Sequence, residues 1–121
     1  MAGRFPLYSD ADLHGPVVSA LKRAGWDVMR AIDAYPERTP DSVHFERAAR
    51  EQRVYLANDS DIPSIAREWL AAGRPFRGLI YWPRSHYRSM SPGDFVRTLD
   101  GLAAADDPFG SYPVIYLKLR R

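Results

Sequence analysis

Short apolar runs alternate with amphipathic stretches along the whole chain of 121 residues, and this alternation limits the folds that are open to it. The runs rich in β-forming side chains predict strands over residues 5–8, 26–32, 54–57, 78–82 and 114–117. Between them, apolar residues recur three and four positions apart, which is typical of a helix with one buried face. Strands and helices in regular alternation predict an α/β protein. We expect a single domain, residues 1–121, built as a three-layer α/β/α sandwich around a five-stranded, mainly parallel sheet.

Local signals mark where several of these helices begin and end. Thr39 and Pro40 predict a helix start with Thr39 as the N-cap. Gly25 is a natural end for the first helix. Ser91 and Asp94 have the spacing of a capping box, so a helix is expected directly after Ser91.

Composition excludes several classes of protein. The chain has no cysteine, which rules out disulfides and thiolate metal sites and suits the reducing cytoplasm. It has no apolar run long enough for a transmembrane helix and no hydrophobic signal segment, so a cytoplasmic protein with no membrane contact is expected. The net charge of +2 permits nucleic-acid binding without arguing for it.

Acidic residues follow two of the predicted strands. Asp10 and Asp12 come after the first strand, and Asp59 and Asp61 come after the third. Asp41 begins a helix that is entered from the end of the second strand. Because the carboxyl ends of parallel strands lie at one edge of a sheet, these acids are expected to meet if the first and third strands are close together.

Carboxylates gathered in this way repel one another and need a positive countercharge. Mg²⁺ or Mn²⁺ prefers carboxylate oxygens and can activate water for phosphodiester hydrolysis. The acids thus predict a metal site in a nuclease. Asp27 and Asp107 precede strands, so the same geometry excludes them.

A basic and aromatic loop follows the fourth strand at the same predicted edge. Arg84 and Arg88 can contact a nucleic-acid backbone, and Tyr87 or Trp82 can stack on a base. With His86 between them, these residues form the predicted nucleic-acid-binding segment, and the expected substrate is RNA or DNA.

Three segments of the chain resemble the PIN-like domains, in particular a short bacterial PIN-like family of uncharacterised function. They are Tyr8–Leu13, the helix 41–50 that ends in Arg-Ala-Ala-Arg, and Val54–Asp61 with its Asp-x-Asp. The resemblance covers about the first two thirds of the chain. It implies an α/β/α fold and a metal-dependent ribonuclease, often the toxin of a toxin–antitoxin pair. The implied partners are an antitoxin protein and a second copy in a homodimer.

Carried over by position, the resemblance makes Asp10, Asp41, Asp59 and Asp61 catalytic and metal-binding. Asp12 stands where relatives often have Asn or Asp and is added to the metal ligands. Many PIN domains place a glutamate in the middle helix. Here both Asp41 and Glu46 are available, and the pattern leaves open which of the two faces the metal.

Other interpretations of the same residues remain open at this level. Asp61 can be a helix cap, and Asp41 can complement a helix dipole. A phospho-acceptor receiver domain would use Lys118, but the chain lacks its final helix. A phosphatase would use Asp10 as nucleophile and Asp12 as acid and base, but a lysine site and a cap are missing. An inactive PIN-like scaffold that binds RNA or a partner protein would keep the acids.

Overall fold

The computed structural model describes residues 4–10, 15–34, 36, 38–82, 90–105, 107–110 and 112–116. Its elements alternate as the sequence predicts. In chain order they are β1 (Leu7–Ser9), α1 (Gly15–Arg23), β2 (Val28–Arg30), α2 (Ala31–Ala34), α3 (Asp41–Arg50), β3 (Val54–Ala57), α4 (Ile62–Ala71), β4 (Leu79–Tyr81), α6 (Pro92–Ala104) and β5 (Val114–Tyr116).

The five strands form one sheet in the order β2-β1-β3-β4-β5, and every pair is parallel. The α/β class and the parallel five-stranded sheet are therefore confirmed. β1 pairs directly with β3, with Tyr8 opposite Tyr55. The acids that follow the first and third strands can meet only if these strands are close together, and the pairing of β1 with β3 fulfils this condition.

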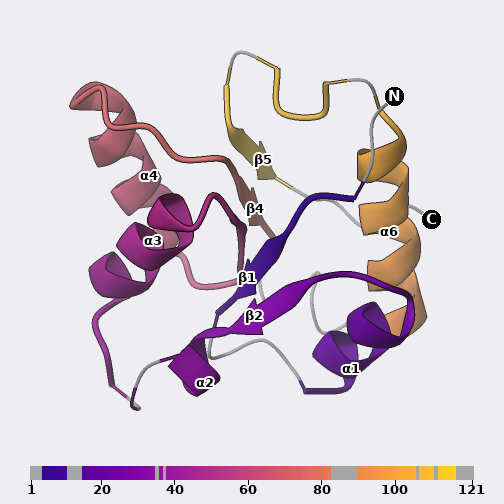
Figure 1. The fold of residues 1–121 in the computed structure, drawn as a ribbon. Coiled ribbons are helices and arrows are strands. Elements are labelled where there is room, and N and C mark those ends of the chain that lie inside the picture. The colour runs from indigo at the N-terminus through magenta and orange to yellow at the C-terminus, as the bar shows by residue number, and fades with distance from the viewer. Residues whose placement is uncertain are drawn as a thin grey trace.

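Helices cover both faces of the sheet (Figure 1), as a three-layer sandwich requires. Helices α1 and α6 lie on one face, and α3 and α4 lie on the other. The strand residues alternate between the two sides, because successive side chains of a strand point in opposite directions. Leu56 and Ile80 pack toward α1 and α6, whereas Tyr55 and Leu79 pack toward α3 and α4.

Two of the predicted helix boundaries are confirmed. Gly25 follows α1 with a φ of 98°, a left-handed conformation that glycine adopts without steric cost. The Ser91 side chain accepts a hydrogen bond from the Asp94 amide, and the Asp94 side chain accepts one from the Ser91 amide. The capping box before α6 is therefore present.

Other boundaries differ from the sequence prediction. The N-cap of α3 is Pro40, and the Thr39 hydroxyl instead donates to the Pro36 carbonyl at 2.6 Å. Thr39 is one position too early because Asp41 is the first helical residue. The second strand is confined to Val28–Arg30, and its predicted end turns into the short helix α2. Leu117, the predicted end of the last strand, lies outside the described residues.

Within the part of the chain that the structure describes, no helix is both long and apolar enough to span a membrane.

Candidate metal centre

The carboxyl ends of the parallel strands form one edge of the sheet, and one part of this edge lies between β1 and β3. From β1 the chain crosses to β2 on one side, and later strands are added on the other side, so the winding direction reverses between β1 and β3. In open parallel sheets, ligands bind outside the strand ends at such a reversal. The pairing of β1 with β3 continues to this point, since the Asp10 amide donates to the Leu56 carbonyl at 3.0 Å.

The period of the strands places Asp10 and Asp59 on one side of this edge. Asp10 is two residues beyond Tyr8, and Asp59 is two residues beyond Ala57. Both Tyr8 and Ala57 belong to the core between the sheet and helices α3 and α4. Continued alternation therefore directs the two carboxylates toward the side on which α3 and α4 begin.

Three carboxylates come together there. Asp41, Asp59 and Asp61 each offer an oxygen, and these oxygens all lie within 4.8 Å of one another. Asp41 is the first residue of α3, and Asp61 immediately precedes α4. Two helix starts and one strand end thus bring together residues that are up to 20 positions apart in the chain. Oxygens at this spacing suit a hard divalent cation.

The turn between β3 and α4 is held by Asp59. One carboxylate oxygen of Asp59 accepts a hydrogen bond from the Asp61 amide at 3.0 Å, and its carbonyl accepts one from the Ile62 amide at 3.2 Å. Asp61 occupies the N-cap position of α4 but makes no side-chain capping bond. Asp61 is therefore the N-cap residue by position, while its carboxylate belongs to the acidic group.

The acids range from buried to exposed. Asp10 is 6% exposed, Asp41 and Asp59 are half-buried, and Asp61 is exposed. Asp59 and Asp61 form no ion pair with any residue among those that the structure describes. Among the described acids, Asp10 is therefore the least accessible to solvent and Asp61 the most accessible.

Asp10 is near these acids but is not one of the three. Its charge, like those of Asp41 and Asp59, acts on the buried hydroxyl of Tyr55. Burial is the main cause that raises the pKa of Tyr55, and the charges of Asp10 and Asp41 follow. Burial and these negative charges therefore both favour the neutral phenol.

A buried polar layer lies beneath the acids. The Tyr8 hydroxyl and Nδ1 of His44 are 2.8 Å apart and share a hydrogen bond. The ring centroids of Tyr8 and Tyr55 are 5.5 Å apart, and the ring of Phe45 stacks on that of Tyr55 with a centroid distance of 5.9 Å. Burial lowers the pKa of His44, so its imidazole is favoured in the neutral form.

The sequence interpretation did not include Tyr8, Tyr55 or His44 in the site. A signal for them exists, because Tyr8 and Tyr55 precede Asp10 and Asp59 by two and four positions. Even spacings along a strand place side chains on the same face. Counting back from each acid in steps of two would therefore have identified both tyrosines.

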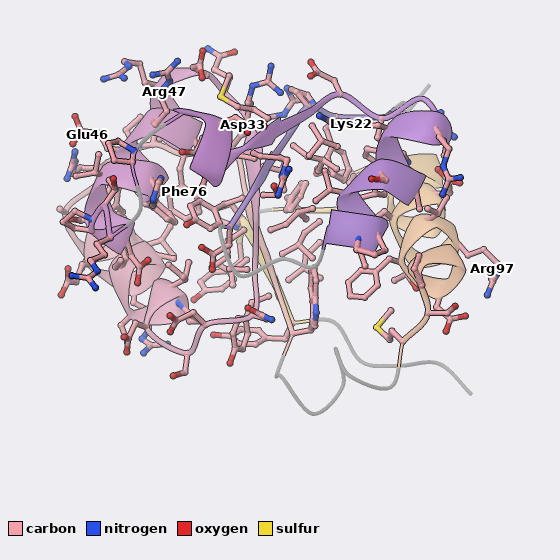
Figure 2. The ribbon with its side chains drawn as sticks, turned by 90° about the horizontal axis from the view of Figure 1, so that it is seen from below. Lys22, Asp33, Glu46, Arg47, Phe76 and Arg97 are labelled. Atoms are coloured by element: carbon pink, nitrogen blue, oxygen red, sulfur yellow. The ribbon has the colours of Figure 1, made fainter. Side chains whose placement is uncertain are left out.

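The choice between Asp41 and Glu46 is decided by the rotation of α3. Asp41 contributes to the acidic group, whereas Glu46 is exposed and lies at the outer margin of the molecule (Figure 2). Five residues of helix turn the side chain by about 140° beyond a full turn, so the two acids occupy different faces. Glu46 is thus directed away from the candidate site.

Trp82, the other side chain expected to stack on a base, is fully buried in the core, so that prediction is wrong. The remaining predicted site residues lie outside the described part of the chain. They are Asp12 from the metal set and Arg84, His86, Tyr87 and Arg88 from the nucleic-acid-binding set. Lys118, which the receiver interpretation needs, also lies outside it. Asp27, which the sequence excludes, forms an ion pair with Arg53 at 3.0 Å.

A hollow of about 400 Å³ lies away from the acids. Its lining comes from the C-terminal end of α3 and the segment before β4: Ala49, Gln52, Pro75, Phe76 and Arg77. Asp41 and Ala49 are separated by roughly 12 Å along α3. The hollow is therefore at the other end of that helix and takes no part in the acidic group.

Comparison of the chain with protein-family models, curated proteins and solved structures gives no significant match. The resemblance to PIN-like domains stays a prediction from the residues named above.

Proposed function

We propose that this protein is a metal-dependent nuclease that hydrolyses phosphodiester bonds in RNA. The observation that carries the proposal is the group of three carboxylates, Asp41, Asp59 and Asp61, at the reversal point of a parallel sheet. A bound Mg²⁺ or Mn²⁺ would neutralise these charges, activate water and stabilise the departing oxygen of the phosphodiester.

The four acids differ in their proposed roles. Asp41, Asp59 and Asp61 hold the cation through their converging oxygens. Asp10 is too deeply buried to contact a polymer, so it acts from beneath and adds negative charge that strengthens cation binding. The exposed Asp61 marks the side from which the phosphodiester enters.

The test combines thermal unfolding with RNA cleavage. We expect Mn²⁺ to raise the melting temperature of the parent protein, because a ligand that binds only the folded state stabilises it by about 2.7 kcal/mol at a concentration of 100 Kd. Asp59→Asn keeps an oxygen that can accept from the Asp61 amide, so the turn is retained while a charge is lost. We expect Asp10→Asn and Asp59→Asn to fold, to lose most of the Mn²⁺ stabilisation and to lose cleavage of single-stranded RNA.

Glu46→Gln is the matched control, because it removes one negative charge from the outer side of α3, the helix that Asp41 begins. It should bind Mn²⁺ and cleave RNA like the parent. Cleavage by both Asp variants at the parent's rate would contradict the proposal. Mn²⁺ stabilisation without cleavage would instead favour a scaffold that binds a cation and does not hydrolyse RNA.

A further inference from the structure

Tyr55 is a buried residue of β3, the central strand that ends two positions before Asp59. It is 1% exposed, and its ring is held between Tyr8 and Phe45 at centroid distances of 5.5 and 5.9 Å. It shares a strand face with Ala57, the last residue of β3, and Asp59 follows two positions after that strand ends. Phe45 is one turn beyond Asp41 in α3, so the Tyr55 ring packs against the helix that supplies Asp41.

The hydroxyl of Tyr55 has no hydrogen-bond partner among the residues that the structure describes. Tyr8 provides the contrast in the same layer, because its hydroxyl is bonded to His44 at 2.8 Å. A buried hydroxyl that makes no hydrogen bond lowers stability, so such groups in native proteins call for an explanation.

The surroundings of this hydroxyl point to a ligand of the acids. The charges of Asp10, Asp41 and Asp59 all act on this hydroxyl, while the ring of Tyr55 belongs to the core between the sheet and helices α3 and α4. A neutral phenol is a weak cation ligand compared with a carboxylate, but it readily exchanges hydrogen bonds with water. Mg²⁺ and Mn²⁺ retain several waters when carboxylates bind them, and groups next to the ligands orient that shell.

We propose that Tyr55 is a positioning residue of the metal site, whose hydroxyl accepts a hydrogen bond from a water carried by the cation that Asp41, Asp59 and Asp61 bind. This inference rests on the metal site of the proposed function. It adds that the site is completed by a strand residue beneath the acids and that the partner of the Tyr55 hydroxyl arrives with the cation.

The test is the substitution Tyr55→Phe, which removes only the hydroxyl. Without divalent metal, the variant should melt roughly 3 °C higher than the parent, because a buried polar group without a partner is lost. Its Kd for Mn²⁺, measured by calorimetric titration, should rise about three- to tenfold, because one hydrogen bond to the hydrated cation is missing. A purely structural role would change the melting temperature and leave the Kd unaltered.

Tyr8→Phe is the control. It removes a hydroxyl from the neighbouring strand, but that hydroxyl already has a partner in His44. We expect Tyr8→Phe to lower the melting temperature without metal and to keep the parent's Kd for Mn²⁺.

The outcomes separate this inference from the proposed function. Equal Kd values for the parent and Tyr55→Phe overturn the role of Tyr55 and leave the metal site standing. A parent protein that does not bind Mn²⁺ overturns both. A parent that binds Mn²⁺ without cleaving RNA overturns only the nuclease, and a weaker Kd for Tyr55→Phe would still support the inference.

Discussion

At the residue scale, His44 links the polar layer under the acids to the pH dependence of stability. Burial lowers its pKa from the ordinary value of 6.5, and Nδ1 is bonded to the Tyr8 hydroxyl. The unfolded chain therefore takes up a proton on His44 at a higher pH than the folded chain does. As pH falls below the unfolded pKa, protonation favours unfolding, so this histidine makes the protein less stable in mild acid.

The variant His44→Asn tests that dependence. The amide oxygen of asparagine can take the place of Nδ1 and accept from Tyr8, but it does not titrate in this range. We expect the parent's free energy of unfolding to fall between about pH 7.5 and about pH 5.5, and the fall to be smaller in the variant. Denaturant unfolding at both pH values measures it, and equal slopes in the two proteins would argue against the assignment.

At the scale of elements, the start of β4 is packed tightly against the segment before β5. A Cβ on Gly78 would lie 2.6 Å from Cε1 of Phe109, which is closer than real carbon atoms approach. The ring of Phe109 in turn packs edge-on against the ring of Phe5, with a centroid distance of 5.4 Å, so it has little freedom to move away. Glycine at position 78 therefore allows the chain after α4 to enter the sheet next to this ring.

Gly78→Ala should destabilise the protein by about 1–3 kcal/mol, because the added methyl group overpacks this contact. Urea unfolding measures the change. The double variant Gly78→Ala, Phe109→Leu replaces the neighbouring ring with a smaller side chain. Its loss of unfolding free energy should be smaller than the sum of the losses in the two single variants, since the residues share one contact. Additive costs would show that Phe109 is not what limits position 78.

At the scale of the whole molecule, the sheet is buried unevenly from its centre to its edges. β3 has a paired strand on each side and all four of its residues are buried. β2 and β5 each pair on one side only within the described sheet, and each has a single buried residue. Asp10 and Asp59 thus follow the two central strands, β1 and β3, whose residues are all buried.

Hydrogen–deuterium exchange should reproduce this gradient. Amides of β3 are expected to exchange slowest, because they open only with the global unfolding of the domain, and amides of β5 are expected to exchange faster. Mass spectrometry of peptides that cover 54–57 and 114–116 gives the comparison. Exchange in β5 as slow as in β3 would mean that another chain segment or a second copy covers that edge.

Local patterns in the chain were sufficient to predict the alternation of elements and the acids that follow the strands. These features are local: hydrophobic period, glycine conformation and capping residues act within a few positions of each other. The capping box at Ser91 and the stop at Gly25 follow from neighbouring residues alone. The position of Asp59 after a buried strand is equally local.

Which residues share the candidate site depends instead on long-range packing. The adjacency of β1 and β3 depends on how the helices pack across the sheet, and no local pattern encodes it. The rotation of α3 selected Asp41 over Glu46, because packing of Phe45 fixes which helix face meets the sheet. The position of Tyr55 relative to the acids depends on both the adjacency of β1 and β3 and the rotation of α3. Residues that are far apart in the chain meet only when the layers of the fold pack together. The sequence pattern could therefore predict that acids lie at the carboxyl edge of the sheet, but not which side chains form the candidate site there.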